Sequence, residues 1–391
     1  MTVRYIDTFS YKTGHLQFNT SFLTMLSEIY DKVEYYAGKS SMEEVYKLLN
    51  KDGAFPLNVR NNRVFVYRGD NRLSLLIRYV ISALLNLIML FRSQKNDVII
   101  YNFNNLFSLH LINAVNRITQ RKVLICCHGE LELLSGSTEE GGWLFKCLRY
   151  LARDFFLQNR KIHDNVYFMV LGDVILENLR NYLSEDQLKK FISVDHPYIF
   201  IKQTQNVNKE KCNGGLQIGT VGAFSQIKGA DLFVKIVSKV KNPNVHFSIT
   251  GRIFYPMERL KQLGVDTAID ADKKVLSQGI YNERIGRLDF ILFLYSSNSY
   301  RITASGAVMD AINLKKPIIA LENDYFCYLF KKYGSFGRLF KSLEEMTVYL
   351  SDHIQKEYLQ TYNFEKIQNL MSPQCVAKDL HGKLKRIGFV L

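Results

Sequence analysis

A glycine-bearing loop in the second half of the chain carries residue types that bind phosphate. In "IGTVGAFSQIKGADLF" (218–233), Gly222 follows an apolar run and Lys228-Gly229 precede a helical pattern. A lysine at a helix start suits phosphate charge, because the free N–H groups and the dipole of the helix also attract anions. The stretch contains neither a Walker A motif nor GxGxxG, which disfavours a P-loop ATPase or an ordinary NAD enzyme. On its own it also fits an exposed lysine in a turn.

A second loop of this kind lies in "SYRITASGAVMDAINLKKPIIALEN" (299–323), directly after the strand-like "RLDFILFLYS". Ser305 can cap the helix that begins here, and Gly306 exposes backbone N–H groups that can bind phosphate oxygens. Asp310, in the next turn, could accept hydrogen bonds from ribose hydroxyls. The alternative is structural, with Ser305 as an N-cap and Asp310 as a charge that compensates the helix dipole.

Histidines follow two predicted strands in the N-terminal half. Gly14-His15 lie after "VRYIDT" and before an amphipathic helical pattern. There a glycine allows close approach to a ligand, and the imidazole could bind phosphate or sugar. The strand-like "KVLICCHG" brings His128 and Glu130 to its carboxyl end, with Glu132 just beyond, and these groups could orient a hydroxyl or transfer a proton. The alternatives are a plain βα turn at Gly14 and a capping or satisfied core histidine at His128.

The elements that must position these residues alternate between strand-like and helix-like stretches. Continuous runs of Val, Ile and Tyr are typical of strands covered on both faces. Strand–helix alternation predicts a parallel sheet with right-handed crossovers. In the N-terminal half we expect strands at 3–8, 32–38, 63–69, 97–103, 122–129 and 165–172, and helices at 18–30, 41–50, 73–92, 106–118, 143–158 and 173–181.

A second α/β series follows a polar stretch, "HPYIFIKQTQNVNKEKCNGG" (196–215), whose Gly-Gly end is typical of a linker. The sequence therefore predicts two Rossmann-like, doubly wound α/β domains. Ligands of such sheets bind at the carboxyl ends of the strands, where the four loops lie. In this half we expect strands at 216–224, 245–251, 267–272, 288–296 and 317–323, and helices at 229–240, 255–263, 273–286, 305–315, 324–332, 342–356 and 363–386.

The composition indicates a basic globular protein. The 391 residues are 47% hydrophobic and 23% charged, and the formal net charge is +14. This excess favours an anionic partner such as nucleic acid, anionic lipid or a phosphorylated substrate, although it can also serve solubility alone. The sequence contains no RRM, KH, zinc-finger or helix-turn-helix pattern, which disfavours nucleic acid. Six scattered cysteines and a first segment without an apolar h-region lead us to expect reduced thiols in a cytoplasmic protein, with no metal site.

One stretch, "LSLLIRYVISALLNLIMLF" (73–91), is nearly apolar and about as long as a membrane span. Arg78 and Asn86 interrupt it, and a strand-like run follows at once. The pattern favours a buried helix of the α/β series. A helix that touches a membrane, or one that spans it, is the alternative.

Together the four loops resemble those of the GT-B glycosyltransferases, in particular the family 4 nucleotide-sugar enzymes. The resemblance is clearest over 216–323, where "IGTVGAFSQIKGADLFVKIV" looks like the donor phosphate loop and "SGAVMDAINLKKP" like the signature helix. It is looser in "TGH", "HGELE" and "DHPY" of the N-terminal half. The resemblance implies donor-binding residues Gly222, Lys228, Gly229, Arg252, Tyr300, Arg301, Ser305, Gly306 and Asp310, catalytic residues His128 and Glu130, and cleft or acceptor residues Gly14 and His15.

The implied reaction moves a sugar, of the hexosyl type, from a nucleoside diphosphate sugar to an acceptor hydroxyl, without a cofactor or metal. The implied domains face a cleft: an acceptor-binding domain (1–200), a linker (201–215), a donor domain (216–362) and a terminal helix that crosses back (363–391). The acceptor would be a glycan or lipid-linked intermediate of bacterial cell-surface polysaccharide or glycolipid synthesis. The basic N-terminal half could then rest on anionic lipid at the inner face of the cytoplasmic membrane.

The chain departs from the family at one position. The family usually places a Glu eight residues before the second acid, where this chain has Ile302, and residues 299–306 contain no acid at all. The departure leaves the retaining or inverting outcome undetermined. It also keeps a second class open, a non-catalytic GT-B-like subunit that binds a nucleotide or sugar for a partner enzyme. "DAD" (270–272) has the form of a metal-binding pair, but we expect a turn there.

Overall fold

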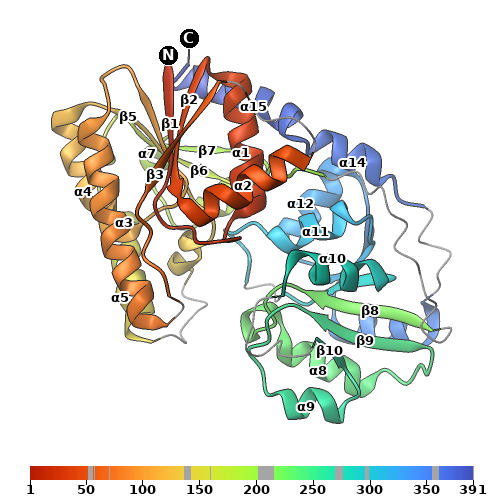
Figure 1. Ribbon diagram of the computed structural model, residues 1–391. Helices are drawn as coiled ribbons and strands as arrows, with labels where there is room; N and C mark the ends of the chain where they lie inside the picture. Colours follow the sequence, from red (N-terminus) through yellow and green to blue (C-terminus); the bar gives the residue numbers. More distant parts are fainter. Residues whose placement is uncertain are drawn as a thin grey trace. The chain divides into compact units, whose positions relative to one another are not determined.

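The computed structural model describes residues 1–51, 56, 58–69, 71–135, 142–158, 160–200, 215–268, 276–295, 299–354 and 361–390. The described chain forms two compact units, each with its own sheet (Figure 1). The first comprises Met1–Ile199, Ile302–Ala304 and Met371–Leu391, and the second comprises Phe200–Arg301 and Ser305–Leu370. Residues 201–214 of the predicted linker and the "DAD" stretch lie outside the described residues.

The first unit is built on a seven-stranded parallel sheet in the order β3-β2-β1-β4-β5-β6-β7. The order reverses between β1 and β4, so their carboxyl ends flank a switch point, the position where open α/β sheets bind ligands. The strands are β1 (Thr2–Asp7), β2 (Lys32–Gly38), β3 (Val59–Val64), β4 (Val98–Tyr101), β5 (Lys122–Cys126), β6 (Val166–Val170) and β7 (Phe191–Ser193).

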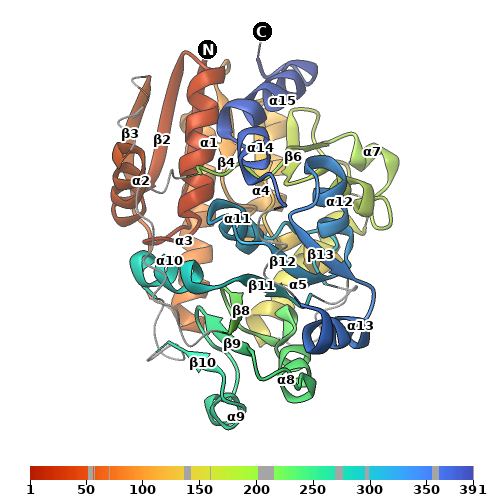
Figure 2. The same cartoon turned by 90° about the vertical axis from the view of Figure 1, so that its right-hand side faces the viewer.

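Helices cover both faces of this sheet, as its continuous apolar strands require. On one face lie α1 (Leu16–Ile29), α2 (Lys39–Lys51) and the C-terminal helix α15 (Pro373–Arg386), which packs along α1 (Figure 2). On the other face lie α3 (Arg72–Arg92), α4 (Leu106–Thr119) and α5 (Trp143–Phe156). Shorter helical segments are η1 (Glu130–Leu134), α6 (Asp173–Leu179) and α7 (Glu185–Leu188).

Helix α3 contains the nearly apolar stretch 73–91, and it is buried on one side only. Arg78 is buried and donates to the carbonyl oxygens of Tyr67 and Gly69, while the buried Asn86 accepts a hydrogen bond from Thr8. These bonds hold α3 against the sheet as a layer of the fold. The other side of the helix exposes large apolar side chains, so the expectation of a simply buried helix is wrong for that side.

The second unit is a six-stranded parallel sheet in the order β10-β9-β8-β11-β12-β13, with its switch point between β8 and β11. Its strands are β8 (Leu216–Val221), β9 (Val245–Thr250), β10 (Asp266–Thr267), β11 (Phe290–Phe293), β12 (Ile318–Leu321) and β13 (Gly337–Phe340). Its helical segments are η2 (Gln226–Lys228), α8 (Ala230–Lys239), α9 (Met257–Gln262), α10 (Gln278–Arg287), α11 (Gly306–Asn313), α12 (Asp324–Tyr333), α13 (Leu343–Val348), the π-helix η3 (Tyr349–His353) and α14 (Phe364–Leu370).

Several elements differ from the sequence-based expectation, and the short edge strands β7 and β13 were not predicted. The third strand is the polar "VRNNRV" of β3 and not the apolar 63–69, because β3 is an edge strand whose partly exposed positions accept polar side chains. The expected single helix at 363–386 is divided into α14 and α15. Ser372 accepts a hydrogen bond from the backbone N–H of Cys375, and Pro373 occupies the first turn of α15, so a new helix begins there.

Candidate functional site

The centre of the candidate donor site is the ammonium group of Lys228. Lys228, at the end of η2, is half-buried, and its Nζ makes no hydrogen bond or ion pair with any other residue that the structure describes. A Cβ on Gly222 would lie 3.5 Å from this Nζ and 3.9 Å from the Cβ of Ala307, in the first turn of α11. Gly222 therefore leaves an open space between the lysine and a helix N-terminus, and burial lowers the pKa of the lysine. A cation and free N–H groups in this arrangement are suited to an anion.

Glycines close the backbone around this space. Gly229 has φ +82, and a Cβ there would lie 2.1 Å from the carbonyl oxygen of Leu294. Gly251, with φ +141, packs so closely on Gly222 that a Cβ would lie 1.9 Å from its carbonyl oxygen. The loops after β8 and β9 thus meet through two glycines, an approach that a side chain would prevent.

The start of α11 is organised by an aromatic side chain. Ser305 is buried and holds the N-cap position, but its side chain does not cap the helix. Its Oγ lies 3.0 Å from the hydroxyl of Tyr295, whose ring stacks on that of Tyr300 at a centroid distance of 4.0 Å. The N–H groups of the first turn are therefore not satisfied by Ser305, in contrast to the simple capping interpretation.

Asp310 faces the half-buried phenol of Tyr281. Its Oδ2 accepts a hydrogen bond of 2.9 Å from the hydroxyl of Tyr281 on α10, and burial together with the Asp310 charge raises the pKa of Tyr281 well above its usual value. The same carboxylate opposes the lowering of the Lys228 pKa, which places both charges in one local field. Tyr281 was not predicted, because a helix at 278–287 gives no sequence signal of contact with a residue 29 positions away.

Two further donors lie at the end of β9. The Nε of Arg252 and the buried Oγ1 of Thr250 have no hydrogen-bond partner among the described residues. The guanidinium of Arg252 lies over the ring of Phe254 at 4.9 Å. Because Gly251 stands between them and contacts Gly222, these donors belong to the same strand-end cluster as Lys228.

The loop from 299 to 304 has a different arrangement. Tyr300 has the left-handed φ of 58, and Arg301 is directed to Asp324, with an Nε–Oδ2 distance of 3.7 Å. Ile302, at the position where the family has an acid, is buried. Its backbone N–H and the hydroxyl of Thr303 both donate to the Glu132 carboxylate, at 3.1 and 3.2 Å. Glu132 thus binds this segment of the first unit.

Three histidines gather at the switch point of the first sheet. His15 lies 4.4 Å from His128 between ring centroids, and Phe18 contacts both His128 and His196 edge-on. Nε2 of His128 is 2.7 Å from the carbonyl oxygen of Asn102. Burial holds the pKa of His128 well below its usual value and that of His196 at about 4, so both rings are neutral at physiological pH.

A hydrogen-bond network positions the residues around this histidine cluster. Asp7, at the end of β1, accepts hydrogen bonds from the N–H groups of Phe9 and Ser10 and from the side-chain amide of Asn19. The hydroxyl of Tyr5 contacts Asn19 and Asn102 at 2.9 and 2.8 Å. His15 itself is exposed and has the left-handed φ of 55, an uncommon conformation for a residue other than glycine that is often found at functional sites.

Glu130 lies beside His128, and the pKa of its carboxyl group is unusually high. Its Oε2 accepts hydrogen bonds from the N–H groups of His128 and Gly129 at 2.8 and 3.1 Å. Burial raises its pKa to about 7, although these hydrogen bonds oppose the change. A carboxyl that titrates near neutral pH, next to neutral imidazoles, can exchange a proton with an acceptor hydroxyl.

A pocket of about 470 Å³ opens in the first unit at the carboxyl ends of β2 and β3. Its lining combines aromatic, basic and apolar residues from the loop after β1, from the ends of β2 and β3 and from the segments that follow these two strands. Such a lining is suited to sugar rings and phosphates, and no sequence pattern indicated that these residues converge. They are Tyr11, Gly38, Lys39, Ser40, Val64, Phe65, Val66, Tyr67 and Arg68.

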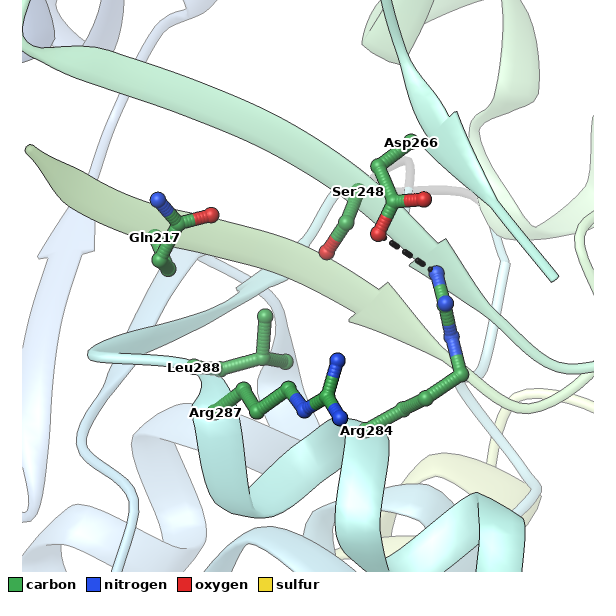
Figure 3. A pocket seen from close by; sticks show the side chains of 6 residues that line it. All are labelled: Gln217, Ser248, Asp266, Arg284, Arg287 and Leu288. Carbon is green, nitrogen blue, oxygen red and sulfur yellow. Dashed lines mark hydrogen bonds and ion pairs between the residues drawn. The ribbon is translucent and has the colours of Figure 1, made fainter. Parts of the chain in front are cut away.

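Figure 3 shows another hollow, in the second unit, of about 60 Å³. Its lining includes Gln217 near the amino end of β8, Leu288 and Ser248. Its most prominent charge, on Arg284, is paired with Asp266 at 2.8 Å. The hollow is too small for a nucleotide and lies away from the strand-end cluster around Lys228, so we assign it no role in the site.

The two doubly wound parallel sheets, and the C-terminal helix that packs on α1, define the GT-B fold. Solved structures share this fold over nearly the whole chain at low sequence identity. Sucrose-phosphate synthase from Thermosynechococcus elongatus is 13% identical with a TM-score of 0.67, covering 100% of this chain and 99% of the synthase.

Two further neighbours extend the comparison. HepE of Anabaena, solved in complex with UDP, is 11% identical with a TM-score of 0.63, covering 99% of this chain and 100% of HepE. The lipopolysaccharide outer core galactosyltransferase WaaB is 13% identical with a TM-score of 0.57, covering 99% of both chains. No family model and no curated protein sequence matches the chain. The predicted GT-B fold is confirmed.

Proposed function

We propose that the protein is a glycosyltransferase that uses a nucleoside diphosphate sugar as donor. The observation that carries the proposal is the Lys228 ammonium, which has no hydrogen-bond or ion-pair partner among the described residues, beside a first turn of α11 that Ser305 does not cap. Both would stabilise the negative charge that develops on the leaving diphosphate, so the reaction needs no metal ion. Asp310, with Tyr281 as its partner, would accept hydrogen bonds from the ribose. The UDP complex of HepE, a protein of the same fold, supports a nucleotide as ligand.

The acceptor would bind at the histidine cluster of the first unit. His15 and His128 would orient the acceptor hydroxyl, and Glu130 would receive its proton. We propose a hexosyl group as the sugar and, as acceptor, a glycan or lipid-linked intermediate of cell-surface synthesis. The reaction would take place in the cytoplasm or at the inner face of the cytoplasmic membrane. Support comes from the aromatic and basic pocket at β2 and β3, and from WaaB as a structural neighbour.

The first test is a thermal-shift panel with UDP, GDP, ADP, CDP and TDP on the wild type, Lys228→Ala and Lys239→Ala. Lys239 is an exposed lysine in the last turn of α8 and serves as the matched control. A bound nucleotide raises the melting temperature by mass action. We expect one nucleotide to do so in the wild type and in Lys239→Ala, with a much smaller effect in Lys228→Ala. No shift with any nucleotide at millimolar concentration would contradict the donor site.

A second candidate, a non-catalytic nucleotide-binding subunit, is favoured by Ile302 at the position of the expected acid. Incubation with the preferred nucleotide sugar separates the two. An enzyme slowly hydrolyses its donor without an acceptor, and a chelator such as EDTA leaves this rate unchanged if no metal takes part. A protein that binds the nucleotide but never releases free sugar would be the subunit.

A further inference from the structure

Helix α3 presents an apolar stripe that nothing in the described chain covers. Among the described residues it is the helix long and apolar enough, by composition, to cross a membrane. Its exposed large side chains recur at the helical period and so lie on one side of about five turns, a stripe about 27 Å long. They are Leu73, Val80, Leu84, Ile88 and Phe91, with Leu84 57% and Phe91 60% exposed.

Helices α4 and α5 continue this surface, α4 packed against α3 and α5 packed against α4. Helix α4 contacts both α3 and α5, and all three lie on the same face of the first sheet (Figure 1). On α4 the exposed apolar residues are Leu111 and Ile118, the latter 85% exposed, and on α5 they are Trp143 and Tyr150. Each pair is separated by seven residues, or two helical turns, so the stripes run along their helices. Trp and Tyr are the residues enriched where a membrane meets water.

The charged residues of the three helices are almost all basic. Together α3, α4 and α5 contain seven lysines and arginines and a single acidic residue, Asp154, which pairs with Arg160. Exposed basic side chains lie at both ends of α3, in the last turn of α4 and along α5. They are Arg72, Arg92, Arg117, Lys146 and Arg153. A basic surface with exposed apolar residues is complementary to a bilayer that contains anionic lipid.

We propose that the exposed face of α3, α4 and α5 is a docking surface for an anionic lipid bilayer. The three helices would lie in the plane of the interface, with the apolar stripes in the headgroup region and the basic side chains on lipid phosphates. Helix α3 would not span the membrane, because Arg78 and Asn86 fix its other side to the fold. A second copy of the chain is a poor occupant, since it would bring the same positive charge to the interface. This surface does not depend on the donor site or on the proposed reaction.

Sedimentation with vesicles tests the docking surface directly. One set is phosphatidylcholine alone and the other contains about one third phosphatidylglycerol, each at low and high salt. We expect the wild type to bind the anionic vesicles at low salt. The double variant Leu84→Ser/Phe91→Ser, and separately Lys146→Gln/Arg153→Gln, should each weaken binding by about tenfold or more. The matched control Val348→Ser/Lys239→Gln changes exposed residues of the second unit and should bind like the wild type.

Three outcomes would overturn the proposal. The wild type could ignore anionic vesicles at low salt. It could bind them with the Leu84/Phe91 variant unaffected, which would move the contact to another basic surface. It could form a dimer that this variant dissociates, which would make a second copy the occupant. Because the substituted side chains are exposed, all variants should melt within a few degrees of the wild type, and this measurement shows that a loss of binding is not a loss of folding.

Discussion

At the scale of single residues, Lys228 is a group whose placement costs stability in the free protein. Its half-buried ammonium loses hydration and forms no ion pair with any residue that the structure describes, and the lowered pKa of Lys228 reflects this loss. An anion bound beside Lys228, as we propose, would pair with this charge and offset the lost hydration. Binding residues commonly show this exchange of stability for function.

Replacement of Lys228 by methionine should therefore have two opposite effects. The side chain keeps its length and loses its charge, so the free energy of unfolding without nucleotide should rise by about 0.5–2 kcal/mol. The affinity for a nucleoside diphosphate should fall by about 10- to 100-fold, the loss of one charge-assisted contact. Urea denaturation and calorimetric titration measure the two effects. Lys239→Met should change neither, and a Lys228→Met variant that is destabilised and still binds nucleotide would contradict this account.

The raised pKa of Glu130 predicts how the stability of the protein depends on pH. Its pKa is about 7 in the folded chain and about 4.3 in an unfolded one, so between these values the folded state holds more protons. The favourable contribution of Glu130 to the free energy of unfolding is therefore fully present below about pH 4 and is lost as the pH rises through 7. In Glu130→Gln this loss disappears.

Chemical denaturation at pH 5 and pH 8 measures the difference between Glu130→Gln and the wild type. The free energy of unfolding of Glu130→Gln, relative to that of the wild type, should be about 1–3 kcal/mol higher at pH 8 than at pH 5. The contributions of His128 and His196 are common to both proteins and cancel. Parallel pH profiles of the two proteins would show that Glu130 titrates at its ordinary pKa.

The sequence predicted which residues lie at strand ends, but not what each one touches. Gly222, Lys228 and Ser305 follow predicted strands, and the parallel α/β pattern alone brings such residues to one edge of a sheet. The hydroxyl of Tyr295 on Ser305 and that of Tyr281 on Asp310 depend on side-chain packing, which has no periodic signal. For the same reason, the sequence predicted Ser305 as a possible N-cap and did not predict that its hydroxyl contacts that of Tyr295.

At the scale of elements, the loops after β8 and β9 form one unit because two glycines meet. The backbone N–H of Gly222 donates to the carbonyl oxygen of Thr250, and Gly251 packs against Gly222. The loop that carries Lys228 is thus positioned by the neighbouring strand and not only by its own helix. The two glycines have different surroundings, however, which separates their roles.

Alanine at each glycine should distinguish binding from folding. A Cβ at Gly222 meets nothing closer than 3.5 Å, so Gly222→Ala pays mainly the left-handed φ of 82, about 1–2 kcal/mol. The methyl group would stand beside Lys228 and should weaken nucleotide binding by about tenfold or more. Gly251→Ala would clash with backbone at 1.9 Å and should destabilise the protein by more than about 3 kcal/mol. Melting curves with and without nucleotide check both, and equal loss of stability in the two variants would contradict the distinction.

Strands and helices of this fold could be predicted where burial gives a strong pattern. Buried apolar side chains dominate β4 and β5 and recur along β1 and β8, and these strands were predicted within about three residues of their observed bounds. β3 was placed too late, since an edge strand needs no apolar run and the neighbouring "VFVY" has the stronger β propensity. The exposed side of α3 could not be predicted either, because a helix that is apolar on all sides gives no indication of which side the fold covers.

At the scale of the whole molecule, each unit has its own core. In the first, β1 and α1 pack with α15, including the buried Leu380. In the second, β8, β9 and β11 pack with α8, including the buried Phe233. The C-terminal segment therefore contributes buried side chains to the core formed by β1 and α1.

Two separate cores predict two separable unfolding transitions in calorimetry. Leu380→Ala removes a fully buried side chain, so it should destabilise the first unit by about 2–5 kcal/mol and lower one transition by several degrees. The preferred nucleoside diphosphate should raise the other transition, since Lys228 and the α11 N-terminus both belong to the second unit. Phe233→Leu should lower that second transition and leave the first in place. A single transition that responds to both substitutions and to the nucleotide would instead show that the two units unfold as one cooperative body, and the donor site would then be linked in stability to the histidine cluster of the first unit.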